Sequence, residues 1–256
     1  IAETYQTFGD EIDRYTMDQA VADGITVPIK YHPRIAKVLL NQEKAKEIEA
    51  YYARCAEEGS TAEDIAKSKK AMSSLEILLG EPERLDKLAV DIHDHYTSIV
   101  AKDPDRVQKA MIVCSNRKIA YDLLLRFKEH YPGWFVERKT PEDKSATEKE
   151  LKKLTEMPTI AMVASVGSND EKEMYNYLGG VRNDQRTSKC DAAFKNPKSN
   201  FRIVIVVDMW ITGFDVESLT YIYNDKPLQK HSLIQTISRA NRKYPGKEYG
   251  LIVDYI

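Results

Sequence analysis

The sequence predicts an α/β fold in which helices cover both faces of a parallel sheet, with a helical region inserted near its start. Two patterns indicate this fold. After Pro104, short apolar runs alternate with amphipathic segments, which is typical of parallel strands buried on both faces. Before Pro104, stretches rich in Ala, Glu, Lys and Leu between 34 and 101 carry apolar side chains at helical spacing. With 256 residues, 42% of them hydrophobic, the chain can bury the core of one large domain or of one domain with an appendage.

The expected elements follow in chain order. Thr16 can cap a short helix, and the alternation at 25–31 after Gly24 indicates a strand of the same sheet. Two or three helices are expected within 34–101. Buried strands are expected at 110–114, 159–164, 203–207, 220–223 and 249–253, and helices at 118–130, 184–194 and 232–242. The chain therefore divides into the start of the sheet domain at 1–33, a helical insertion at 34–104 and the main part of the sheet domain at 105–256.

Composition sets limits on partners and compartment. The 38 basic and 40 acidic side chains give a net charge of -2, so a grip on nucleic acid has to come from local patches. The three cysteines lie far apart and form no C-x-x-C pair, which favours neither a disulfide framework nor a zinc site. No apolar run approaches the roughly 20 residues that span a bilayer, and the N-terminus has no signal-peptide layout. We expect a cytoplasmic chain that is cut from a longer protein.

The first candidate site follows the strand at 110–114. Ligands of open parallel sheets bind beyond the carboxyl ends of the strands, so the residues after each apolar run are the candidates. Ser115, Asn116 and Arg117 bring a hydroxyl, an amide and a guanidinium to the start of a helix, where a phosphate would be well bound. Simple capping of the helix by Ser115 or Asn116 explains the same residues equally well.

The second candidate site follows the strand at 203–207. Asp208, Thr212, Gly213 and Asp215 place two carboxylates, a hydroxyl and a glycine in one turn. Gly213 would let the backbone approach a ligand closely, and Thr212 could bond a phosphate oxygen. The alternative is an ordinary glycine turn in which Asp215 caps the next element.

The third candidate site is the helix at 232–242. Gln235, Arg239 and Arg242 are spaced by four and three residues, so they project from neighbouring parts of one helix face. A guanidinium is always charged and presents forked donors, which suits the charge that develops on a transferring phosphoryl group. On an ordinary surface helix, the same trio is more often a solvated face.

In combination, these strings resemble a known family. Thr212-Gly213-Phe214-Asp215, followed by Gln235-x-x-Ser238-Arg239-x-x-Arg242, resembles motifs V and VI of superfamily 2 helicases and translocases, with 110–117 in the place of motif IV. The longer strings are similar to the R (restriction, motor) subunit of type I restriction endonucleases; they lie at 8–13, 27–29, 207–215, 224–227, 238–242 and 250–255. No motif of that family is recognised at 34–101 or 132–158. The resemblance implies a RecA-like fold and the second of two motor lobes.

The resemblance also implies the roles of the candidate residues. ATP lies between two lobes in such motors, and the second lobe supplies arginines, here Arg239 and Arg242, as the catalytic groups at the γ-phosphate. The implied ATP-binding residues are Gln235, Gly213, Asp215, Arg239 and Arg242, and the implied DNA-backbone contacts are Ser115, Asn116, Arg117 and Thr212. The implied partners are double-stranded DNA, the first lobe and nuclease domain of the same chain, and the modification and specificity subunits.

Parts of such an enzyme have no counterpart in this sequence. It contains no G-x-x-x-x-G-K-[ST] and no D-E-x-[HD], so ATP and Mg²⁺ are expected in the intact enzyme but not on this fragment alone. Glu150-Leu151-Lys152 has the E-x-K spacing of a nuclease, but a solvated helix is favoured. His93 and His95 would point to different faces of a helix, so no metal site is predicted. Two alternatives stay open: the second lobe of another superfamily 2 helicase or repair translocase, and an inactive DNA-binding or subunit-binding module.

Overall fold

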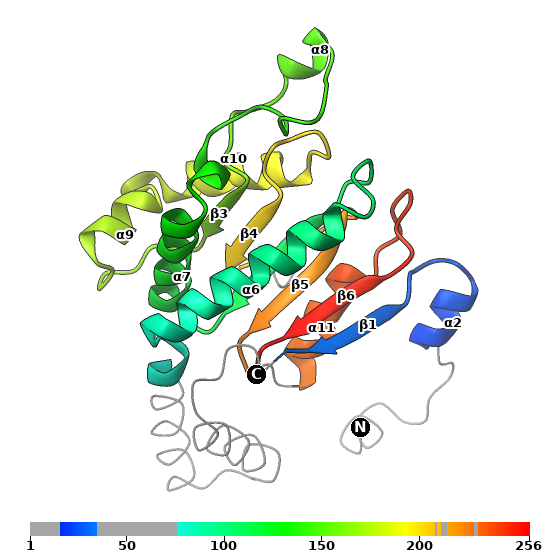
Figure 1. Ribbon diagram of the computed structural model, residues 1–256, viewed down its shortest axis with the longest axis horizontal. Coiled ribbons are helices and arrows are strands. Elements are labelled where there is room, and N and C mark those ends of the chain that lie inside the picture. The colour runs from blue at the N-terminus through cyan, green and yellow to red at the C-terminus, as the bar shows by residue number, and fades with distance from the viewer. Residues whose placement is uncertain (1–15, 35–75, 208, 211–213, 228–229) are drawn as a thin grey trace, which may run out of the picture.

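The chain forms one parallel sheet with helices on both faces (Figure 1). The structure, a computed structural model, describes residues 16–34, 76–207, 209–210, 214–227 and 230–256. Within these ranges the sheet order is β1-β6-β5-β2-β4-β3, and every pairing is parallel. The strands are β1 Ile29–Pro33, β2 Lys109–Cys114, β3 Ile160–Val163, β4 Ile203–Val206, β5 Leu219–Asp225 and β6 Gly250–Asp254. The predicted parallel α/β fold is confirmed.

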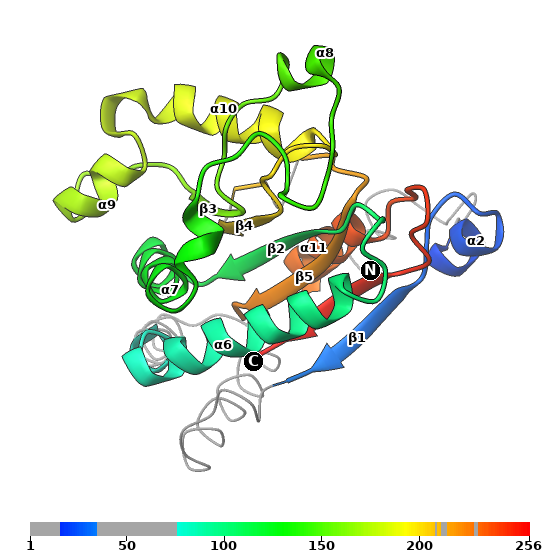
Figure 2. The ribbon, with the colours of Figure 1, turned by 45° about the horizontal axis from the view of Figure 1, so that its top comes forward.

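Two hydrophobic cores lie on the two faces of the sheet, because successive strand side chains point to opposite faces. Ile112 packs in the core under α6 (Pro82–Val100), α7 (Arg117–His130) and α9 (Lys172–Tyr177). Its neighbours Met111 and Val113 pack in the core under α10 (Asn183–Lys195) and α11 (Lys230–Ala240). Figure 2 shows α6 and α7 on one side of the sheet and α11 on the other. This double burial explains the continuous apolar runs from which the strands were predicted.

Helix α6 lies within the range 34–104 that the sequence predicts as a helical insertion. The helix forms as expected, and Leu85, Leu88 and Ile92 are fully buried in the core with the strands. This part of the range therefore belongs to the sheet domain itself. Residues 35–75 lie outside the described residues, so the domain boundaries stay a prediction.

The remaining elements are short. Helix α2 (Met17–Ala22) has the predicted Thr16 cap. The backbone N–H of Gln19 donates to Thr16 Oγ1 at 3.2 Å, and the backbone N–H of Thr16 donates to Gln19 Oε1 at 2.7 Å. The 3-10 helices are η1 (Pro132–Phe135) and η2 (Gly180–Arg182). Helix α8 (Glu148–Leu151) sits on an excursion that extends from the body (Figure 1).

Glu150, the acidic residue of the E-x-K string, has a local structural role. It forms a capping box with Thr147 at the start of α8 and accepts a hydrogen bond from Lys198 Nζ at 2.5 Å. The hydrogen bond from Lys198 lowers the pKa of the Glu150 carboxyl to about 2.

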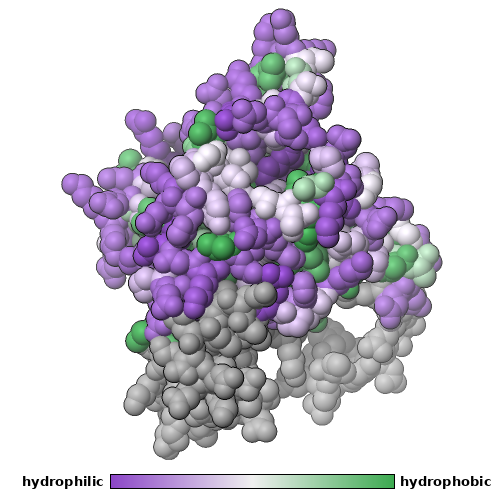
Figure 3. All heavy atoms as spheres, in the orientation of Figure 1, coloured by the Kyte–Doolittle hydropathy of each residue, from purple (hydrophilic) through white to green (hydrophobic). Residues whose placement is uncertain are grey.

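The surface seen in Figure 3 is dominated by hydrophilic residues, with apolar residues scattered singly over it. In the described parts of the chain, every helix is too short or too polar to cross a membrane.

Candidate functional site

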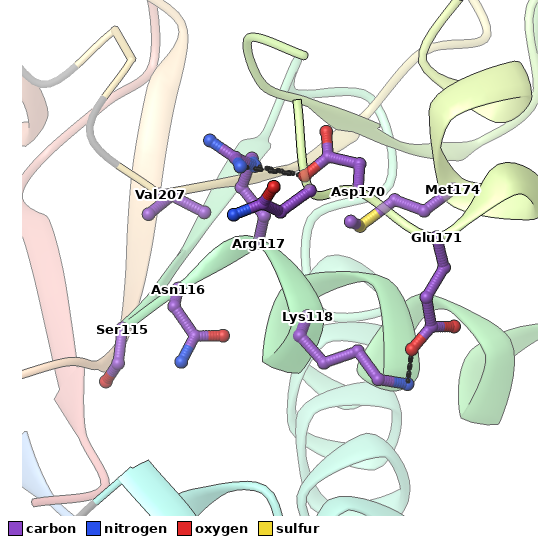
Figure 4. A pocket seen from close by; sticks show the side chains of 9 residues that line it. Ser115, Asn116, Arg117, Lys118, Asp170, Glu171, Met174 and Val207 are labelled. Carbon is purple, nitrogen blue, oxygen red and sulfur yellow. Dashed lines mark hydrogen bonds and ion pairs between the residues drawn. The ribbon is translucent and has the colours of Figure 1, made fainter. Parts of the chain in front are cut away.

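The first candidate site lies where it was predicted, at the carboxyl end of β2. Ser115, Asn116 and Arg117 follow this strand and open helix α7. With residues from the segment before α9, from α9 itself and from the position just after β4, they surround a cavity of about 530 Å³ (Figure 4). The lining residues are Ser115, Asn116, Arg117, Lys118, Asn169, Asp170, Glu171, Met174 and Val207.

Ser115 and Asn116 both make structural hydrogen bonds. Asn116 Oδ1 accepts from the Ile119 N–H at 2.9 Å and so caps α7. This agrees with the interpretation that Ser115 or Asn116 caps the helix. Ser115 Oγ donates to the carbonyl oxygen of Asp225 at 3.1 Å and ties β2 to the end of β5. Their phosphate-binding role stays a prediction.

Arg117 is held by an acidic residue that the sequence did not single out. Its Nε and Nη2 both donate to Asp170 Oδ1, at 3.0 and 2.7 Å, while Asp170 Oδ2 accepts from the Gly167 N–H at 2.7 Å. The Asp170 side chain is 3% exposed and that of Arg117 is 36% exposed. A fixed guanidinium therefore borders the cavity.

The carboxyl end of β5 carries a buried ion pair. Arg84 Nη2 lies 2.5 Å from Asp225 Oδ1, and Arg84 Nη1 donates to the carbonyl oxygen of Leu79. Burial raises the pKa of the Asp225 carboxyl in spite of the Arg84 charge. The pair fixes the start of α6 beside the Ser115 end of β2, which gives a structural role to part of the string 224–227.

The third candidate site differs from its prediction in one respect. Helix α11 ends at Ala240, so Gln235 and Arg239 are helical but Arg242 is not, and the predicted helix at 232–242 is too long. Arg242 forms an isolated antiparallel bridge with Thr26, and the Val27 N–H donates to the carbonyl oxygen of Asn241 at 2.8 Å. Pairing with the chain before β1 thus replaces the last helical turn.

The structure joins the second and third candidate sites. Arg239 Nη1 donates to the carbonyl oxygen of Phe214 at 2.9 Å, and Arg242 Nη1 lies 3.1 Å from Asp215 Oδ2. The side chains of Arg242 and Asp215 are 44% and 55% exposed. Gln235 is exposed, and its carbonyl oxygen accepts from Ser238 Oγ. Asp208, Thr212 and Gly213 lie outside the described residues.

An aromatic stack holds Phe214, the residue whose carbonyl oxygen Arg239 contacts. The rings of Trp210 and Phe214 are stacked with centroids 4.0 Å apart, and Phe194 of α10 packs on both. Trp210 has a φ of 66°, in the left-handed region that bulky residues rarely adopt. Sequence analysis assigned no role to Trp210 or Phe194, because their proximity depends on the fold.

The first candidate site lies at one end of the strands, and the joined second and third candidate sites lie at the other end. Asp215 precedes β5, and Arg242 precedes β6. Helix α11 runs back from the end of β5, and a Cβ on Gly250 at the start of β6 would lie 2.2 Å from the Ala240 carbonyl oxygen. The prediction that all three sites lie beyond the carboxyl ends is therefore wrong for Arg239, for Arg242 and for Asp215, which pairs with Arg242. The two edges of the sheet are therefore about one strand length apart, which is roughly 17–20 Å for a typical strand.

No group of three or more His, Cys, Asp or Glu side chains in the described ranges is arranged to hold a metal ion. What the sites offer to a ligand is positive charge: Arg117 and Lys118 at one edge of the sheet, and Arg239 and Arg242 at the other. Guanidinium and ammonium groups of this kind bind phosphate oxygens.

Comparison with known proteins shows similarity to type I restriction enzyme subunits. The family model described as type I restriction enzyme subunit R domain 3 matches residues 134–256, and a SWI2/SNF2 ATPase model matches residues 2–65. A protein of Methanocaldococcus jannaschii named as type I restriction enzyme MjaIXP endonuclease subunit is 34% identical over 254 residues, which cover 99% of this chain and 21% of the relative. The type I restriction enzyme HindI endonuclease subunit of Haemophilus influenzae is 33% identical over 261 residues, with the same two coverages.

A solved structure supports the fold. A fragment of an HsdR subunit of a type I restriction enzyme from Vibrio vulnificus YJ016 aligns with 99% of this chain and 36% of its own, with a TM-score of 0.51 and 15% identity. The chain spans about a fifth of the length of the curated relatives it matches. The chain has a RecA-like α/β fold and is similar, over nearly its whole length, to one part of type I restriction enzyme R subunits.

Proposed function

We propose that this chain is the second motor lobe of an R subunit, which acts in ATP-dependent translocation of double-stranded DNA before cleavage. One observation carries the proposal: Arg239 and Arg242 bond to Phe214 and Asp215, so the two strings that resemble motifs VI and V form one unit. A change at the nucleotide can then reach the segment that leads back to the end of β4. In this role the chain works in the cytoplasm, beside modification and specificity subunits.

Arg239 and Arg242 fit a triphosphate that another lobe holds. The pair of Arg242 with Asp215 is half exposed, and such pairs contribute only about 0–1 kcal/mol, so Arg242 can exchange the carboxylate for a phosphate oxygen. Arg239 is oriented by its hydrogen bond to the backbone carbonyl oxygen of Phe214. ATP supplies the phosphoryl group, and the two guanidinium groups stabilise the negative charge that develops on it. Gln235 and Gly213 complete the nucleotide side in this proposal.

The phosphate-binding loop and the Mg²⁺ ligands have to come from the first lobe, because the sequence contains neither motif. Ser115, Asn116, Arg117 and Thr212 form the DNA side of the proposed motor. They contact the sugar-phosphate backbone and do not read bases, which suits a motor that moves along any sequence.

The test compares the ATPase activity of this chain with that of the chain extended upstream through the first lobe, with and without linear double-stranded DNA. We expect only the extended chain to be active. Arg242→Ala in the extended chain should lower turnover by about a thousandfold or more, as the loss of such an arginine does in related NTPases.

Lys243→Ala is the matched control, since Lys243 is the neighbouring exposed cation and donates to the Gly24 carbonyl oxygen. It should retain nearly full turnover. Hydrolysis by this chain alone, or normal turnover of the folded Arg242→Ala variant, would contradict the proposal.

A further inference from the structure

The cavity at the carboxyl end of β2 contains two residues whose geometry goes beyond the family resemblance. We propose that Gly167 and Asp170 are positioning residues, which hold the Arg117 guanidinium in the conformation that contacts a DNA phosphate. This inference rests on the proposed DNA contact of Arg117. Neither residue belongs to a string that resembles a helicase motif.

Asp170 is itself fixed before it fixes Arg117. One carboxylate oxygen accepts two N–H groups of Arg117, and the other accepts the Gly167 N–H. Because its side chain is 3% exposed, water and salt have little access to this carboxylate. A flexible arginine loses rotamer freedom when it binds a ligand, and this contact removes that freedom beforehand.

Gly167 leaves the space that the guanidinium fills. A Cβ at this position would lie 2.1 Å from Arg117 Nη2 and 2.9 Å from Arg117 Cζ, so any side chain would displace the guanidinium. The bonds to Asp170 use Nε and Nη2 only, which leaves Nη1 for a ligand. Figure 4 shows the guanidinium reaching from the start of α7 to Asp170 at the border of the cavity.

The neighbouring ion pair, between Lys118 and Glu171, is exposed to solvent, unlike the pair of Arg117 with the buried Asp170. Lys118 Nζ lies 3.4 Å from Glu171 Oε1, and the two side chains are 53% and 62% exposed. Exposed pairs of this kind are weak and screened by salt, so Glu171 does not hold Lys118 in one place. Glu171 then only adds negative charge beside a DNA path. Two adjacent carboxylates should therefore have effects of opposite sign: Glu171→Gln should tighten DNA binding slightly, whereas Asp170→Asn should weaken it.

The decisive variant is Gly167→Ala in the full-length R subunit, assembled with its partner subunits, because it leaves every charge in place. The measurements are the affinity for linear double-stranded DNA at several salt concentrations, and the DNA concentration for half-maximal ATPase. We expect DNA binding to weaken about tenfold, the size of one lost charge-assisted hydrogen bond, with an unchanged maximal ATPase rate. Gly133→Ala is the matched control, since a Cβ at Gly133 would meet nothing within 4 Å.

A double variant tests whether Gly167 acts through Arg117. Gly167→Ala combined with Arg117→Ala should bind DNA no more weakly than Arg117→Ala alone, because the group being positioned is gone. Asp170→Asn, which keeps an acceptor for the Gly167 N–H, provides a second route to the same result if Gly167→Ala does not fold.

The outcomes separate this inference from the proposed function. If Arg117→Ala leaves DNA binding unchanged, the proposed DNA contact of Arg117 fails, and the inference fails with it. If Arg117→Ala weakens binding but folded Gly167→Ala and Asp170→Asn bind like the unaltered subunit, only the positioning role is overturned. Additive losses in the double variant would also overturn it.

Discussion

At the residue scale, Lys247, which follows Arg242 in the loop before β6, carries a buried amine. It is 6% exposed, and its Nζ donates to the carbonyl oxygens of Glu217 at 3.1 Å and Leu219 at 2.5 Å. Burial, and then the nearby charge of Arg106, lowers the pKa of Lys247 to about 7. Lys247 thereby anchors the turn that leads from Asp215 into β5.

This lowered pKa predicts a pH dependence of stability. As the pH falls from about 10 to about 7, the unfolded chain takes up a proton on Lys247 and the folded chain does not, so the free energy of unfolding falls over this window and levels off below it. Lys247→Met should lack this contribution. The measurement is denaturant unfolding of both proteins between pH 6 and about 10, with Lys243→Met as the control for the loss of a charge. A difference in stability that is the same at every pH would refute the prediction.

The residues of the candidate sites were predictable only where the pattern is local. Asn116 caps the helix three residues ahead of it, and such a cap can be predicted from sequence. The partners of Arg117 and Arg239 could not be predicted, because Asp170 and Phe214 are distant in the chain and no periodicity relates them. The sequence therefore indicated the charged side chains of the candidate sites, but the residues that bond to Arg117 and Arg239 depend on the fold.

At the element scale, strands were easier to predict than helix ends. The strand at 203–207 is one apolar run because both of its faces are buried, and β4 forms there. The end of α11 was predicted two residues late, since the chain after Ala240 pairs with residues before β1. Two or three helices were predicted within 34–101 from apolar spacing, and α6 is a helix in this range, but such spacing does not say whether an apolar face covers this sheet or another surface.

The packing of α6 on the sheet makes a prediction for two residues of this helix. Leu88 is fully buried, whereas Val90 is 38% exposed. Leu88→Ala should lower the free energy of unfolding by about 2–5 kcal/mol, because it removes buried methyl groups and leaves a cavity. Val90→Ala should stay within about 0.5 kcal/mol of the unaltered chain. Denaturant unfolding measures both, and equal effects would mean that α6 does not cover the core.

At the scale of the whole molecule, the parallel sheet separates the two proposed activities. Arg117 follows β2 at the carboxyl edge, while Arg242 precedes β6 at the amino edge. The resemblance placed both residues in one motor, but it could not give their separation, because that depends on the direction in which α11 returns across the sheet. Val207, the residue after β4, lines the cavity, and the segment that follows leads to Phe214 and Asp215. The two edges are thus joined by one short stretch of chain.

This separation predicts two distinguishable kinetic defects in the R subunit with its first lobe. Arg117→Ala should raise the DNA concentration that gives half-maximal ATPase activity and leave the maximal rate nearly unchanged, because a binding contact is lost and the chemistry is not. Arg242→Ala should lower the maximal rate and leave that DNA concentration nearly unchanged. Although the two side chains share no contact, the proposed motor couples the two edges through the segment after β4, so the free energies of the two defects should not add: the double variant should depart from their sum by more than about 0.5 kcal/mol. A double variant whose defects add within that limit would show that the two edges act independently during turnover, and it would contradict the proposed coupling through the segment after β4.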